Sequence, residues 1–268
     1  MRHRVSALVV TAGACLIAAA LGPQPAGADG LPVYEVDTSR QGIETSSATA
    51  RYVALPAGEG TSVARIDADG GRVRRSTFLE GDFTVPAVAY DGTTSGLSHD
   101  GKVLALIEPR KSFPRPTTGF VLLDAERMRT LEQVRLDGDF SFDAISPNGE
   151  TIYLIEYLDR RDPTNYRVRA YDVDRGSLVA GAIVDPREPP AEMAGLPATR
   201  AVSPEGRWAY TLYQRGGGDE PFIHALDTRR GEAVCIDLEG FASRVMGFEL
   251  LVAPGDGQLT LSDGQAEP

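Results

Sequence analysis

A turn that recurs four times constrains the fold of this chain more than any other feature of its sequence. Each copy carries residues suited to a tight turn, closes with glycine and precedes an apolar strand. The copies are Ser98–Gly101, Ser146–Gly149, Ser203–Gly206 and Ala253–Gly257. Their closing glycines are 48, 57 and 51 residues apart. Self-similarity at this spacing predicts a fold built from repeated β units.

A second repeated segment is a strand of alternating apolar residues that ends in an aspartate. Its copies are Ser62–Asp67, Phe120–Asp124, Val168–Asp172 and Phe222–Asp227. After a short turn each copy leads to another strand, such as Gln133–Leu136 or Ala233–Ile236. Four strands in each repeat predict an all-β fold, a β-propeller of about five four-stranded blades over residues 49–268.

A third echo marks the link between one repeat and the next. Leu79–Phe83 and Leu136–Phe140 share the pattern Leu, acid, Gly, Asp, Phe, and they stand 57 residues apart. Leu238–Phe241 repeats the pattern more weakly. Three echoes in one order support the repeat architecture.

The Ser-Pro-Asn-Gly and Ser-Pro-Glu-Gly turns, each followed by an aromatic-rich strand, resemble the WD-like repeats of exported TolB-type propellers. The resemblance covers roughly residues 50–264 and implies a fold. It implies no particular function, because such repeats serve scaffolds, binding proteins and enzymes alike.

The two ends of the repeat array leave the closure of the ring open. Hairpin-forming strands are predicted near residues 51–56, 102–108, 151–157, 208–214 and 258–264. The last of these blades has no outer strands in this sequence. Either a strand at Val33–Val36, within an N-terminal segment of residues 29–48, completes that blade, or the ring is incomplete.

Residues 1–28 have the features of a cleaved signal peptide. Arg2 and Arg4 precede an apolar stretch, and Ala26-Gly27-Ala28 supplies small residues for cleavage after Ala28. An uncleaved anchor is the alternative. Lipidation at Cys15 is disfavoured, because Ala12 stands where a lipobox has leucine and the apolar run continues beyond the cysteine. We therefore expect a secreted or cell-envelope protein with no membrane span after cleavage.

Cleavage removes two arginines and no acid, so the formal net charge changes from −11 to −13. This charge argues against a nucleic-acid partner, because phosphate binding needs a concentrated positive surface. Cys235 would be the only cysteine left, within an apolar strand pattern, which indicates a buried and inert thiol. We expect no cofactor.

Catalytic and metal-binding patterns are sparse. The chain has no Gly-x-Ser-x-Gly motif, and its two candidate histidines are a turn residue, His99, and a strand residue, His224. Asp137 and Asp139 are weak calcium candidates, since oxygen ligands suit hard cations. The recurrence of the same pattern at Glu80–Asp82 favours plain turn residues instead.

The loops between second and third strands carry the least ordinary surface residues. They span residues 110–116, 159–163 and 215–221, and in a propeller they lie at the same end as the links between blades. The candidate binding residues are Arg110, Phe113, Arg115, Arg160, Arg161 and Arg215. Arginine and aromatic side chains dominate binding hot spots, although ordinary solvated loops are the competing interpretation.

These observations predict a non-catalytic exported propeller that binds a protein or a small ligand of the cell envelope. The alternative is an exported propeller enzyme, such as a metal-assisted hydrolase or lactonase, with carboxylates from several blades in the central channel. The sequence does not identify the partner or the ligand.

Overall fold

The computed structural model describes residues 42–69, 71–163, 165–187, 195–215, 220–241, 244–254 and 257–263. The described residues form strands and turns, and no helix among them is long and apolar enough to cross a membrane. The predicted all-β class is therefore confirmed. The signal peptide expected at residues 1–28 and the closing strand considered at Val33–Val36 lie outside the described residues.

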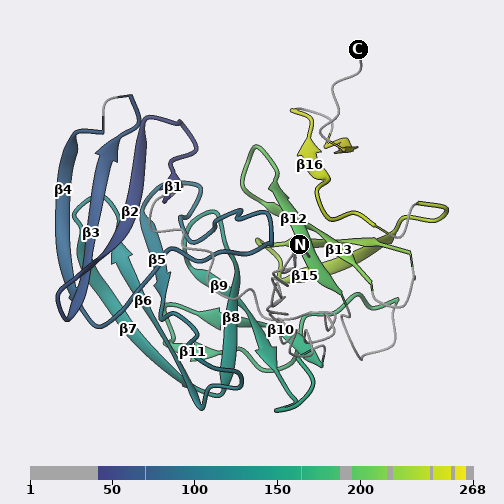
Figure 1. Ribbon diagram of the computed structural model, residues 1–268, viewed down its shortest axis with the longest axis horizontal. Helices are drawn as coiled ribbons and strands as arrows, with labels where there is room; N and C mark the ends of the chain where they lie inside the picture. Colours follow the sequence, from purple (N-terminus) through teal and green to yellow (C-terminus); the bar gives the residue numbers. More distant parts are fainter. Residues whose placement is uncertain are drawn as a thin grey trace, which may run out of the picture.

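Five antiparallel sheets follow one another along the chain, and Figure 1 shows them arranged in an arc from β4 to β16. The first contains β1 (Ile43–Glu44), β2 (Ala50–Ala57), β3 (Gly60–Asp67) and β4 (Val73–Glu80). The second contains β5 (Val103–Ile107), β6 (Thr117–Asp124) and β7 (Arg129–Asp137). The third contains β8 (Asp139–Ile145), β9 (Thr151–Tyr157), β10 (Tyr166–Asp172) and β11 (Ser177–Leu178). The fourth contains β12 (Leu196–Val202), β13 (Trp208–Gln214), β14 (Phe222–Asp227) and β15 (Glu232–Asp237). The fifth contains β16 (Glu249–Val252) and β17 (Leu259–Ser262).

Each pair of consecutive sheets encloses its own apolar core. Val63 and Leu104 belong to the cluster between the first two sheets, and Phe120 and Phe140 to the next. The third and fourth sheets enclose Tyr153, Ala209 and their neighbours, and the fourth and fifth enclose a cluster that includes Leu212 and Leu250. Sheets that pack face to face in chain order form a β-propeller. Among the described residues no strand pairing joins the first sheet to the last.

The recurring turn is held by its serine as well as by its glycine. The Ser98 hydroxyl accepts the Val103 amide at 3.0 Å, and the Ser146 hydroxyl accepts the Thr151 amide at 2.9 Å. Gly149 has φ +78°, the left-handed region that glycine adopts without a Cβ clash. The Asn148 side chain also accepts the Glu150 amide at 3.3 Å.

The repeated aspartates, such as Asp124 at the end of β6 and Asp172 at the end of β10, cap the turns that follow their strands. Asp124 Oδ1 accepts the Arg127 amide at 2.8 Å, and Asp172 Oδ1 accepts the Arg175 amide at 2.9 Å. These carboxylates therefore satisfy backbone amides at a turn, which explains why the residue type recurs.

Residues 84–97 take the place of a regular inner strand in the second sheet. The segment forms isolated bridges to β5, at Thr84 with Ile107 and at Leu97 with Leu104. Between these bridges it reaches the fourth sheet, where the Tyr90 amide donates to Pro197 O at 2.9 Å. Figure 1 shows the segment extending from beside β5 toward β12. It connects inner strands of non-adjacent sheets across the middle of the arc.

Candidate functional site on the loop-bearing rim

The three arginine-bearing loops lie at the same end of the sheets as the links between sheets. We call this surface the rim: the β5–β6, β9–β10 and β13–β14 loops with those links. Lys111 Nζ of the β5–β6 loop lies 2.8 Å from Asp82 Oδ2 in the link before the second sheet. The Leu238 amide, just after β15, donates to Pro221 O of the β13–β14 loop at 3.1 Å. The expected position of the loops is therefore confirmed.

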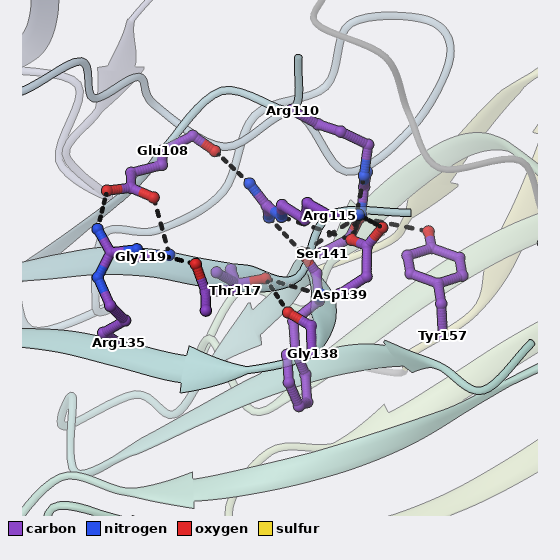
Figure 2. A network of polar contacts seen from close by, with 12 residues as sticks. Glu108, Arg110, Arg115, Thr117, Gly119, Arg135, Gly138, Asp139, Ser141 and Tyr157 are labelled. Atoms are coloured by element: carbon purple, nitrogen blue, oxygen red, sulfur yellow. Dashed lines mark hydrogen bonds and ion pairs between the residues drawn. The ribbon is translucent and has the colours of Figure 1, made fainter. Parts of the chain in front are cut away.

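Two of the candidate arginines are buried and share one carboxylate, as Figure 2 shows. The Arg110 side chain is 4% exposed, and its guanidinium donates to Asp139 Oδ1 through Nε and Nη2. Arg115 is 9% exposed and lies with Nε 3.4 Å from the same oxygen. The Arg115 amide donates to Asp139 Oδ2 at 2.9 Å. These side chains anchor the loop to the first residue of β8 and do not form an exposed contact surface.

Arg115 also bonds to backbone carbonyls on both sides of the loop. Its Nη1 donates to Glu108 O at 2.7 Å, and its Nη2 donates to Phe140 O. Burial, together with the positive charge of Arg110, lowers the pKa of Arg115 to about 10. The two guanidiniums therefore repel each other in a poorly solvated position.

An aromatic pair covers the outer side of this cluster. The Arg110 guanidinium lies 5.0 Å from the centroid of the Tyr157 ring, within the range of cation–π attraction. Phe113 packs edge-on against Tyr157, with ring centroids 5.5 Å apart. The Ser141 hydroxyl accepts Arg110 Nη1 at 3.1 Å and lies 3.3 Å from the Tyr157 hydroxyl. Phe113 is half-buried, so part of its ring faces solvent.

A second ion pair lies on the other side of Arg115. Arg135 Nη2 is 3.1 Å from Glu108 Oε1, and Glu108 Oε2 accepts the Gly119 amide at 3.1 Å. Figure 2 shows this pair continuing the polar network away from Asp139. Glu108, Arg135, Ser141 and Tyr157 were not predicted as site residues. Glu108 directly follows β5 and the others lie in β7, β8 and β9, so no local sequence pattern connects them.

The remaining candidates differ in exposure. Arg160 and Arg161 are exposed in the β9–β10 loop. Arg215 is half-buried, with Nη1 3.1 Å from Asp237 Oδ1 and its guanidinium 4.3 Å from the centroid of Phe222. The structure therefore brings Arg110, Phe113 and Arg115 together and leaves Arg160 and Arg161 available to a partner.

The calcium candidates have separate environments. Asp139 faces two guanidiniums, which repel a cation, and Asp137 is exposed at the end of β7. Within the described ranges, no group of three or more His, Cys, Asp or Glu side chains is arranged to hold a metal ion.

The histidines and the cysteine occupy unremarkable positions. His224 is 2% exposed in β14, and burial lowers its pKa to about 4. His99 is exposed in a turn, as predicted. Cys235 is half-buried in β15, so it is less buried than the sequence pattern indicated, and it takes part in no disulfide within the described part of the chain.

No family model matches the chain, and no curated protein matches it. Among solved structures, hydrazine synthase of Kuenenia stuttgartiensis is 15% identical with a TM-score of 0.49, and the match covers 81% of this chain and 53% of that one. TolB from Acinetobacter baumannii is 15% identical with a TM-score of 0.42 and coverage of 82% and 51%. The Cps50 (Swd1) β-propeller domain of Myceliophteria thermophila is 11% identical with a TM-score of 0.47 and coverage of 82% and 62%.

This chain thus spans about half to three fifths of the length of these proteins. Propellers, TolB among them, are among the structures that it resembles, at the level of fold that the sequence predicted. Fold similarity of this kind carries no activity from one protein to another.

Proposed function

We propose that this protein is a non-catalytic, exported binding module that recognises a protein partner of the cell envelope through the rim. The observation that carries the proposal is the way the β5–β6 loop is fixed. Buried ion pairs from Arg110 and Arg115 to Asp139 hold the loop rigid beside the exposed Arg160 and Arg161. A preformed loop loses little conformational entropy on binding, which favours affinity.

Arginine and aromatic side chains are the residue types that anchor protein interfaces, and Phe113 packs on Tyr157, the last residue of β9, which the loop with Arg160 and Arg161 follows. Leu158, 48% exposed beside Arg160, adds apolar surface to the same region. We assign the direct contacts to Phe113, Arg160 and Arg161. Arg110 and Arg115 support the loop from beneath, and Arg215 is engaged with Asp237.

Two observations weigh against the alternative of a propeller enzyme. Residues 84–97 cross the middle of the arc, where a central catalytic channel would need open space. The buried carboxylate Asp143, near that middle, is paired with Arg200 and so is not free to bind a metal. The export signal proposed at residues 1–28 adds that the partner is met outside the cytoplasm.

The test is chemical cross-linking and mass spectrometry of residues Asp29–Pro268 in a native cell-envelope extract. The rim variant replaces Phe113, Arg160 and Arg161 with alanine. The matched control replaces Arg229 and Arg230, an exposed arginine pair in the β14–β15 turn at the opposite end of the sheets. A partner lost with the rim variant and kept with the control supports the proposal. Equal capture by all three proteins would contradict it.

A further inference from the structure

A partly open cavity lies beside Arg115, between the β5–β6 loop and residues 84–87. Its volume is about 40 Å³, and its walls include Thr84, Pro86, Glu108, Arg110, Arg115 and Ser141. One water needs roughly 10–15 Å³ of such space, while a drug-sized ligand needs several hundred. The cavity therefore has room for a chemical group of a few atoms and no more.

The charges around this cavity do not balance. Three guanidiniums, of Arg110, Arg115 and Arg135, face two carboxylates, of Asp139 and Glu108. Glu108 pairs with Arg135, so Asp139 alone must neutralise the two buried arginines. One positive charge is left over in a position that solvent reaches poorly.

Arg115 also has an unused donor. Its Nε is buried, and among the described residues no acceptor forms a hydrogen bond with it. Asp139 Oδ1, at 3.4 Å, attracts this nitrogen by charge but does not form a hydrogen bond with it. A buried donor without an acceptor is unfavourable, so a ligand that supplies an acceptor and a negative charge stabilises the site.

We propose that this cavity binds a single carboxylate group, which accepts a hydrogen bond from Arg115. A monoanion matches the one excess positive charge. A phosphate dianion would bring a second negative charge close to the Glu108 carboxylate, which also lines the cavity. Planar carboxylates match guanidinium geometry better than spherical anions do.

The inference deepens the proposed function and rests on it in one respect: the carboxylate belongs to an acidic side chain or the C-terminus of the protein partner. The cavity is walled by the β5–β6 loop, so a partner seated on the rim can reach it. Binding of the carboxylate group itself is testable without the partner.

The test uses acetate as the probe and ¹⁵N-labelled Asp29–Pro268, observed through the arginine Nε–Hε signals at constant ionic strength in sodium chloride. The Arg115 signal is the one that disappears in Arg115→Lys, which keeps the charge but lacks Nε. We expect this signal to shift saturably with a dissociation constant on the order of millimolar. Acetate should also raise the thermal stability of the protein, and the dependence of this stabilisation on acetate concentration gives an affinity. This affinity should be at least about fivefold weaker in Arg115→Lys.

Arg74→Gln is the matched control, since it removes one guanidinium from an exposed ion pair with Asp67 on the first sheet. It should bind acetate as the unaltered protein does. The inference is overturned if the Arg115 signal stays unmoved up to about 100 mM acetate, far above the expected dissociation constant. It is also overturned if Arg115→Lys binds acetate undiminished. Partner capture without acetate binding would refute this inference alone, and acetate binding without rim-dependent capture would refute the proposed function alone.

Discussion

Tyrosine hydroxyls tie neighbouring sheets together at equivalent positions, and this arrangement allows a sharp test of the fold. Tyr52 of β2 pairs with Arg65 of β3, and Tyr153 of β9 pairs with Ala170 of β10. In both cases the paired residue lies two positions before the aspartate that ends its strand. The Tyr52 hydroxyl donates to Ala125 O at 3.1 Å, and the Tyr153 hydroxyl donates to Thr228 O at 2.9 Å. Both acceptors belong to the next sheet: Ala125 follows Asp124 at the end of β6, and Thr228 follows Asp227 at the end of β14. Tyr210 of β13 has the same register, but no hydrogen bond of its hydroxyl occurs among the described residues.

Replacing Tyr153 with phenylalanine removes one hydrogen bond and leaves the carbonyl of the buried Thr228 without that donor. A lost bond costs about 0.5–1.5 kcal/mol, and a buried unsatisfied group costs up to about 3. We therefore expect Tyr153→Phe to lower the free energy of unfolding by about 1–2 kcal/mol, with Tyr52→Phe similar. In a chain of this length that corresponds to roughly 2–4 °C in Tm.

Tyr210→Phe is the matched control and should change stability by less than about 0.5 kcal/mol. The assay is urea unfolding with unchanged m-values, which reports stability differences directly. The Tyr52→Phe/Tyr153→Phe double variant should lose the sum of the two effects, because the sites lie in different sheet interfaces. Equal losses in Tyr153→Phe and Tyr210→Phe would refute the reasoning, since the losses would then come from the phenol and not from the inter-sheet bond.

Three further predictions concern stability. Arg200→Met leaves the buried Asp143 carboxylate without its ion-pair partner, so urea unfolding should show a loss of about 3–5 kcal/mol; adding Asp143→Leu should recover part of it, and a double variant as unstable as the summed singles would contradict this. Because burial lowers the His224 pKa to about 4 from 6.5, the folded protein binds fewer protons than the unfolded chain in that window. Stability should fall as pH drops from 6.5 toward 4, and His224→Gln should flatten the decline; an unchanged slope would count against it. Gly138→Ala introduces a Cβ at φ +114° and should cost about 1–3 kcal/mol, which unaltered thermal unfolding would disprove.

The repeat and its strands were predictable because their signals are local. The turn at Ser146–Gly149 and the capping aspartates act on backbone groups within a few residues of themselves. The link at Gly138 was predictable for the same reason, since a positive φ favours glycine whatever the surrounding tertiary structure. The role of the turn serines was not foreseen, although their recurrence was visible.

The candidate site was predictable only in part. The sequence identified the loop at 110–116 and the end of the sheets where it lies. It did not indicate that Arg110 and Arg115 are buried, because their partner Asp139 is 29 and 24 residues away and approaches only when two sheets pack. The crossing of residues 84–97 to β12 was missed for the same reason, since its acceptors belong to the fourth sheet.

The sequence by itself thus determined the number of repeats, the turn chemistry and the end of the sheets that bears the arginine-rich loops, all set by hydrogen bonds between near neighbours. The tertiary structure alone decided which arginines support the loop and which face solvent. It also decided where one positive charge is left without a counter-ion. Burial and electrostatic pairing depend on distances between residues far apart in the chain, and these distances exist only after the sheets have packed.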